Sequence, residues 1–355
     1  MIGRPLFKTL VVPCVLFLCV TVGCATPAGR NALSGVKIIC VWSVEANGQE
    51  ALDQTVEQAK ELGFNAVCWS RDGLVASCHS RAMQAYALLN PLALRPEAQP
   101  QVLAPGEQAL PGFLRDSIPA EQFYQYGGEP LAGRREILDQ NFTCPNDPGV
   151  VPYTLEQVAR LSETGYDGVI FDFVGYRNYR SCQCGLCLAK LEKFRVQHPE
   201  LNARQAGEKF YENVLVDLYE ILYRKTKEIA PGLLIANHIH PVYLPNVFYG
   251  HRVKADYCGI TVSWFFKPHW PLEKVRDYAA KVVSGPYAHD CVEPMPMIGI
   301  YTDREYARDR RSPERLRRDF QIIKAAGAKH LVACELGHIL RDPETARVVR
   351  EELQN

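Results

Sequence analysis

The sequence predicts an α/β fold, a single (β/α)8 barrel of the TIM type, and two observations predict it. From Gly35 onward, eight short apolar runs alternate with stretches of helical periodicity, which is typical of repeated strand and helix units in a parallel sheet. Neither a GxGxxG nor a GxxxxGK motif occurs in the chain, so an open sheet that binds nucleotides through a glycine-rich loop is disfavoured. We therefore expect a closed barrel and no nucleotide cofactor.

The expected elements follow in chain order. The strands cover 36–42, 64–69, 83–89, 168–174, 233–237, 257–262, 297–301 and 330–334, and the helices cover 50–62, 73–80, 154–164, 186–229 with a break near Pro199, 271–284, 313–326 and 343–353. One helix start is marked by Ser312, Pro313 and Glu314, which supply an N-cap hydroxyl, a first-turn proline and a first-turn acid. Gly63 and Gly327 stand where the chain leaves a helix for the next strand, a position that favours glycine.

The composition is that of a folded, charge-balanced protein. The 355 residues include 40 Lys and Arg against 40 Asp and Glu, and 47% of them are hydrophobic. A nucleic-acid binder normally carries a basic excess that neutralises phosphates, so this class of partner is disfavoured. The length admits about two domains, but barrels of roughly 250 residues form one domain.

The first residues are expected to direct export. Arg4 and Lys8 precede an apolar run over 10–22, which is typical of a signal peptide. Residues 20–24 resemble a bacterial lipobox, with Thr21 where Leu is preferred. This predicts a signal peptide over 1–24, lipidation of Cys24, a tether over 25–35 and a barrel over 36–355. The protein would sit in the cell envelope and contact the membrane through its lipid anchor only. Ordinary cleavage near Ala25 or Ala28 is the alternative.

A long insertion follows the third expected strand. Between Asn90 and Tyr153 the chain is rich in Pro, Gly and polar residues and carries an aromatic cluster at 123–126. A loop in this place lies at the C-terminal face of a barrel, where active sites are built. We expect it to form a wall of a substrate site; a surface loop without function is the alternative.

Asp172 is the strongest candidate for catalysis. In the segment 168–174 the side-chain period of two places Gly168, Ile170 and Asp172 on one face, and the bulkier Val169, Phe171 and Phe173 on the other. The bulky face should contact the outer helices, which leaves Asp172 at the last inward position of the strand. A carboxylate there sits at the barrel mouth. A salt bridge to Arg177 or to a neighbouring strand is the alternative role.

Four cysteines have the spacing of a metal site. Cys182, Cys184 and Cys187 form a Cys-x-Cys-x-x-Cys motif, and Cys144 lies upstream. Thiols this close cannot all pair as disulfides, whereas a tetrahedral zinc takes four sulfurs from clustered loop positions. We expect a structural zinc beside Asp172; a disulfide such as Cys144 to Cys182 is the alternative. Cys40, Cys68, Cys258 and Cys334 lie in apolar runs and are expected to fill the core as free thiols.

The segment from 144 to 194, with DGVIFDFVGYRNYRSCQCGLCLAKLEKF at its centre and CPNDP upstream, resembles the bacterial glycosyl-hydrolase-like (β/α)8 barrel proteins. Its cysteine pattern is similar to the zinc cluster of certain barrel β-galactosidases. Those enzymes carry Asn-Glu at the end of the fourth strand, where this chain has Asp172-Phe173, so their acid/base residue is not carried over. The resemblance implies a glycoside hydrolase.

Glycoside cleavage normally needs a second carboxyl group. Glu335 lies just beyond the last strand and Asp303 just beyond the seventh, and Glu45 and Glu293 are weaker candidates. Strands four and eight face each other across a barrel, so Asp172 and Glu335 would suit the wider, inverting spacing.

Residues at other strand ends are expected to bind the sugar. The aromatic side chains that could stack on sugar rings are Trp42, Trp69, Trp264, Trp270 and Tyr301, and the polar ones that could contact hydroxyl groups are Asn90, Tyr176, Arg177 and His238. Some of the aromatic residues would fill the core instead. His238 and His240 form a His-x-His pair, which allows an alternative metal-dependent hydrolase.

The sequence therefore predicts an exported glycoside hydrolase-like barrel that cleaves a polysaccharide or oligosaccharide with paired carboxylates. A carbohydrate-binding barrel without catalysis, and a metal-dependent hydrolase, are the two alternatives.

Overall fold

The computed structural model describes residues 33–103, 141–172, 174–177, 181–239, 252–263, 271–284, 291–300 and 311–354. Its strands are β1 (Lys37–Cys40), β2 (Ala66–Cys68), β3 (Gln84–Leu89), β4 (Gly168–Phe171), β5 (Leu234–Ile239), β6 (Ala255–Ser263), β7 (Cys291–Pro294), β8 (Met297–Gly299) and β9 (Leu331–Cys334). They pair in parallel in the order β5-β4-β3-β2-β1-β9-β8-β6-β7, and β5 also pairs with β6. This last pairing closes the sheet, which confirms the predicted (β/α)8 barrel.

The seventh barrel position is shared by two short strands. β7 pairs with the first half of β6 and β8 with its second half. Met295 and Pro296 separate them, so nine strands occupy eight positions in the barrel. The sequence predicts only the second of the two, because the prolines in CVEPMPM interrupt the apolar run.

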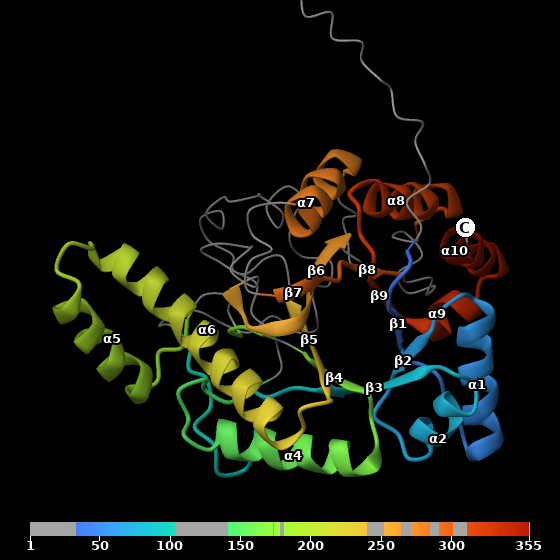
Figure 1. The fold of residues 1–355 in the computed structure, drawn as a ribbon. Helices are drawn as coiled ribbons and strands as arrows, with labels where there is room; N and C mark the ends of the chain where they lie inside the picture. The colour runs from blue at the N-terminus through green and yellow to red at the C-terminus, as the bar shows by residue number, and fades with distance from the viewer. Residues whose placement is uncertain are drawn as a thin grey trace, which may run out of the picture.

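Helices surround the strands on their outer side (Figure 1). They are α1 (Gln49–Glu61), α2 (Leu74–His79), α4 (Val150–Thr164), α5 (Gly185–Gln197), α6 (Ala203–Ile229), α7 (Leu272–Ser284), α8 (Pro313–Ala325), α9 (Leu336–Leu340) and α10 (Pro343–Gln354). All the expected helices are confirmed, including the break before α6, where the Asn202 side chain accepts from the Gln205 backbone N–H in a capping box. The five-residue α9 was not predicted, since it is too short to show a helical period.

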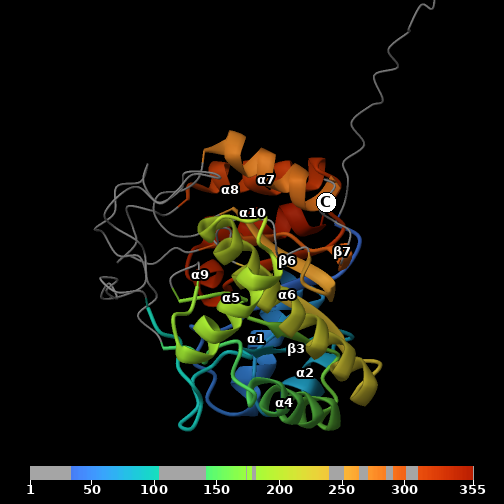
Figure 2. The ribbon, with the colours of Figure 1, turned by 90° about the vertical axis from the view of Figure 1, so that its left-hand side faces the viewer.

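The α5–α6 pair lies to one side of the barrel. Figure 1 shows α5 at the far left, with α6 between it and the strands, and Figure 2 shows the pair from that side. In α5 only Cys187 and Leu191 are buried. This helix therefore has little core of its own.

Side chains divide cleanly between the inside and the outside of the barrel. Ile170 belongs to the interior cluster, while Val169 and Phe171 belong to the cluster between strands and helices, as the alternation predicts. Gly168 has no room for a side chain, because a Cβ atom there would lie 2.2 Å from the ring of Tyr86 inside the barrel.

Within the described part of the chain, no helix is both long and apolar enough to span a membrane. The expected signal peptide, Cys24 and most of the tether lie outside the described residues, as does the aromatic cluster at 123–126.

Candidate functional site

Asp172 follows β4 at the C-terminal end of the barrel. Its backbone N–H donates to the carbonyl of Leu89 at 2.9 Å, which extends the β3–β4 pairing by one residue. Its side chain is 30% exposed, and Oδ1 lies 2.7 Å from Nδ1 of His238 on β5. The carboxylate is thus held at the mouth by a neighbouring strand and still meets solvent.

His238 links Asp172 to the next strand. Its imidazole is buried, and Nε2 lies 3.2 Å from the hydroxyl of Thr261 on β6. The register of β5 and β6 is fixed beside it, because the backbone N–H of Gly259 donates to Asn237 Oδ1 at 3.1 Å. Three adjacent strands therefore present one hydrogen-bonded row, Asp172, His238 and Thr261. Thr261 was not singled out from the sequence; its signal is a hydroxyl at an inward position of an apolar strand.

Sulfur atoms line the barrel beneath this row. Cys40, Cys68 and Cys334 are buried in the interior cluster with Met297, and Cys334 Sγ lies 3.7 Å from Met297 Sδ. Burial raises the pKa of the Cys68 and Cys334 thiols well above their usual value. They fill the core as the sequence predicts. Cys258 is also buried in the core, but it is disulfide-bonded and not a free thiol.

Glu335 follows β9 but is not exposed at the barrel mouth. Its side chain is completely buried and forms the N-cap of α9, where it accepts a hydrogen bond from the backbone N–H of His338 at 2.7 Å. The Ser43 hydroxyl donates to this same oxygen, Oε1, and the backbone N–H of Ser43 donates to Oε2 at 3.2 Å. These bonds join the ends of β1 and β9. The remaining candidate for the second carboxylate, Asp303, lies outside the described residues.

The expected aromatic contacts divide into two groups. Trp42 follows β1 and is 46% exposed, so its ring is available at the barrel mouth. Trp69 is buried on the helix side of the sheet with Arg71 over its ring, and Tyr176 is buried with its hydroxyl donating to the carbonyl of Tyr211 at 2.8 Å. Both are structural residues, which corrects the prediction for them. Trp264, Trp270 and Tyr301 lie outside the described residues.

The remaining polar candidates have local partners. Asn90 Oδ1 accepts from the backbone N–H of Leu92 at 2.9 Å, as in an Asx turn. The backbone N–H of Arg177 donates to Gln101 Oε1 at 2.8 Å. Glu293, a weaker acid candidate, lies 3.6 Å from Lys329. His240 lies outside the described residues.

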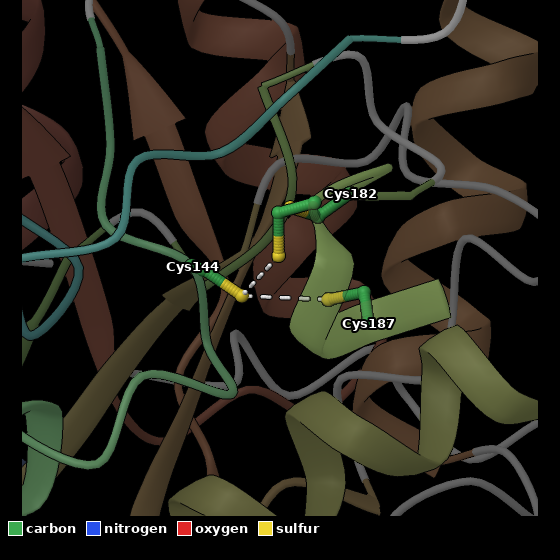
Figure 3. A group of neighbouring side chains, drawn as sticks. Cys144, Cys182 and Cys187 are labelled. Carbon is green, nitrogen blue, oxygen red and sulfur yellow. Dashed lines mark hydrogen bonds between the residues drawn. The ribbon is translucent and has the colours of Figure 1, made fainter. Parts of the chain in front are cut away.

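The four predicted cysteines come together. Cys144, Cys182, Cys184 and Cys187 are all buried, and their sulfur atoms lie within 4.8 Å of one another. Figure 3 shows the thiols of Cys144, Cys182 and Cys187 turned toward one another. Cys144 Sγ lies 3.4 Å from the sulfurs of Cys184 and Cys187, far beyond the ~2.05 Å of a disulfide. A tetrahedral metal with ~2.3 Å bonds to sulfur needs about 3.8 Å between ligands, so the arrangement fits a metal.

Backbone and amide N–H groups surround these sulfurs. The N–H of Asn146 donates to Cys144 at 3.3 Å, the N–H of Val102 to Cys182 at 3.4 Å, and the Asn146 side chain to Cys187 at 3.2 Å. Donors of this kind orient and stabilise metal-bound thiolates. The hydrogen bond from Cys144 lowers the pKa of Cys182, and the same contact raises the pKa of Cys144.

A buried glutamine connects the cysteine cluster with the loop after Asp172. Gln101 Nε2 donates to the carbonyls of Thr143 at 3.1 Å and Gly175 at 3.5 Å. Thr143 directly precedes Cys144, and Gly175 lies three residues after Asp172. The cysteine cluster therefore helps to fix the loop that leaves the site. The sequence did not point to Gln101, since it lies in the long insertion.

Comparison with known proteins supports the fold. No family model and no curated protein matches the sequence. Among solved structures, the chain is similar to the glycoside hydrolase domain of PgaB (BpsB) from Bordetella bronchiseptica, with a TM-score of 0.60 and 14% identity over 90% of this chain and 98% of that one. It is also similar to a β-galactosidase from Rahnella sp. R3, with a TM-score of 0.59 and 11% identity over 90% of this chain.

A β-galactosidase from Halorubrum lacusprofundi gives a TM-score of 0.58 at 12% identity. The chain covers 56% and 58% of these two galactosidases, a little over half of each. At such low identities the likeness concerns the fold. The fold class is a (β/α)8 barrel, which these solved glycoside hydrolases share.

Proposed function

We propose that this protein is a glycoside hydrolase that cleaves a polysaccharide or oligosaccharide, with Asp172 as one of its two catalytic carboxyl groups. The observation that carries the proposal is the position of Asp172: it lies at the C-terminal end of β4, it is 30% exposed, and a buried histidine holds it in place. Barrel enzymes gather their catalytic groups at this end of the strands. The exposed ring of Trp42 supplies a face on which a sugar could stack.

The second carboxyl group is proposed to be Asp303, which follows the seventh barrel strand in the sequence. Glu335 is less suited, because both of its oxygens already accept hydrogen bonds from the backbone. The donors are the N–H groups of Ser43, just after β1, and of His338, in the first turn of α9. Comparison of Asp303→Asn with Glu335→Gln separates the two. A catalytic acid loses turnover in a folded variant, whereas a capping residue loses stability.

The two alternatives make different predictions. A binding barrel without catalysis should bind glycan and release no sugar. A metal-dependent hydrolase should need His238 as a ligand, yet both of its ring nitrogens face Asp172 and Thr261. The test is the release of reducing ends from a panel of polysaccharides, with a chelator in parallel reactions. Turnover that survives the chelator and is lost in Asp172→Asn supports the proposal.

We further propose that the four cysteines hold a structural zinc. Four sulfur ligands close the coordination shell, so the metal would stabilise the loop beside the site and take no part in the reaction. The zinc site is supported by the short distances between the four sulfur atoms and by the N–H groups that donate to them.

Export and lipidation at Cys24 complete the proposal. Their supports are the basic residues and apolar run at the start of the chain and the disulfide at Cys258, because disulfides persist in oxidising compartments.

A further inference from the structure

Asp172, His238 and Thr261 are joined by two hydrogen bonds. Which atoms carry the protons in these bonds decides whether Asp172 is the protonated acid or the ionised carboxylate of the site. A glycosidase uses two carboxyl groups in different protonation states. One is protonated and gives its proton to the leaving oxygen, and the other is ionised and acts as nucleophile or activates water. The inference that follows rests on the proposed function and assigns Asp172 to one of these roles.

The short contact between Asp172 and His238 requires one proton. An ionised Asp172 has none to give, so the 2.7 Å contact then needs an N–H on Nδ1. A neutral imidazole carries a single N–H, so Nε2 must accept. The group placed to donate to it is the hydroxyl of Thr261 at 3.2 Å.

In the opposite arrangement Asp172 is protonated, and the donor and acceptor in each of the two hydrogen bonds are exchanged. A protonated Asp172 would donate to Nδ1, and Nε2 would carry the N–H and donate to Thr261. The hydroxyl proton of Thr261 would then turn to its other neighbour, Met297 Sδ at 3.7 Å. A thioether is a weak acceptor, whereas an imidazole nitrogen is a good one. The hydroxyl thus favours the first arrangement.

Exposure favours the same arrangement. The Asp172 side chain is 30% exposed and His238 only 8%. Water can solvate the carboxylate charge, whereas a charged imidazole in the buried position would lose most of its hydration. The negative charge therefore belongs on Asp172, with a neutral His238 beneath it.

We propose that His238 is a positioning residue that presents Nδ1–H to Asp172, with Thr261 fixing this tautomer, so that Asp172 acts as the ionised carboxylate. Asp172 then either bonds to the anomeric carbon, from which water later displaces it, or takes a proton from the water that attacks this carbon. In both cases the bond to the leaving oxygen breaks, and a different carboxylic acid protonates that oxygen.

Substrates with different leaving groups show whether Asp172 acts as the ionised carboxylate or as the acid. A dinitrophenyl glycoside leaves without protonation, whereas an alkyl glycoside of the same sugar needs the acid. We expect Asp172→Asn to lose on the order of 10³-fold in turnover on both substrates. A variant that keeps near-normal turnover of the dinitrophenyl glycoside and loses only the alkyl glycoside would overturn the assignment.

Histidine substitutions separate positioning from packing. In His238→Asn the amide nitrogen stands where Nδ1 stands in histidine, so it can still donate to Asp172. In His238→Ala no donor remains. We expect the alanine variant to lose on the order of 10–100-fold in kcat, and the asparagine variant to recover most of that loss. Equal losses in two folded variants would contradict the positioning role.

Nitrogen NMR of the imidazole tests the proton placement without reference to activity, so it separates failure of this inference from failure of the proposed function. The His238→Asn variant identifies the His238 signals among the 9 histidines. We expect Nδ1 protonated and Nε2 unprotonated at neutral pH, and loss of this preference in Thr261→Val.

A matched control is Thr154→Val. Thr154 is also completely buried, but its hydroxyl donates to the carbonyl of Val150 within α4, so the His238 signals should not change. An Nδ1 without a proton, or both nitrogens protonated, would overturn the inference. If no glycan is cleaved and the NMR result holds, the proposed function fails and the proton placement stands.

Discussion

Glu335 connects two chain segments at the end of the last strand. It follows the last strand and carries the right chemistry for catalysis, but its side chain is completely buried. The carboxylate then caps α9 and ties β1 to β9. The same alternation that places Asp172 on the inner face would have corrected the prediction for Trp69, which follows the inward-facing Cys68.

Replacing Glu335 by Gln should therefore affect stability first. The variant keeps the side-chain volume but turns an N–H₂ group toward backbone donors, so we expect a loss of about 2–3 kcal/mol in the free energy of unfolding. Chemical denaturation measures this loss. Turnover by the folded fraction should be retained. Unchanged stability together with abolished turnover would restore Glu335 as the catalytic acid.

At the scale of elements, we expect α5 to depend on the cysteine cluster for its stability. The helix buries only Cys187 and Leu191, and it begins directly after Cys184. A metal that joins Cys144 to this turn would replace the apolar core that the helix lacks. The spacing of Cys182, Cys184 and Cys187 indicated that these three thiols lie together, because they are close in the sequence, whereas Cys144 lies 38 positions before Cys182 and joins them only in the fold.

We expect purified protein to contain one zinc per chain, and Cys187→Ala to lose it. Since structural zinc contributes directly to folding, the free energy of unfolding should fall by at least about 2 kcal/mol. Elemental analysis and thermal unfolding measure both effects. Cys78→Ala is the matched control, because Cys78 is an equally buried free thiol outside the cluster, and it should keep its zinc. Zinc-free wild-type protein of full stability would refute the metal site.

The β3–β4 contact tests the packing inside the barrel. A Cβ at Gly168 would meet the Tyr86 ring at 2.2 Å and the carbonyl oxygen of Leu234 at 2.9 Å. We expect Gly168→Ala to cost about 1–3 kcal/mol in unfolding free energy, as overpacked cores do.

Gly207→Ala is the control for this substitution, because nothing lies within 4 Å of its Cβ position in α6. Alanine favours a helix over glycine by roughly 1 kcal/mol, so this variant should be slightly more stable than the wild type. Equal stability of the two alanine variants would mean that the interior has room for a methyl group at Gly168.

At the scale of the whole molecule, the order of strands and helices was predictable because each apolar run and each helical period is local. The sequence did not predict β7, because prolines interrupt its apolar run. It did not predict α9, because that helix is only five residues long. The row of Asp172, His238 and Thr261 could not be predicted, since it depends on the register of three strands whose residues lie up to 89 positions apart.

The proposed lipidation of Cys24 would determine where the molecule resides. If it is lipidated, the mature protein should fractionate with membranes, and its intact mass should show an acylated N-terminal Cys24. Cys24→Ser should shift the protein to the soluble fraction of the cell envelope, while the barrel and its zinc content stay unchanged. A mature N-terminus at Ala25 or later in the wild-type protein would show that the anchor does not exist.

The release of reducing ends from a polysaccharide panel tests the central claim most directly, with wild-type protein and Asp172→Asn compared on every substrate. We predict that the wild-type protein cleaves at least one glycan, and that Asp172→Asn loses on the order of 10³-fold in turnover while it binds the same glycan with similar affinity, because the shape of the site and Trp42 are unchanged. Equal release by both proteins, or binding without release by the wild type, would contradict the assignment of this barrel as a glycoside hydrolase acting through Asp172.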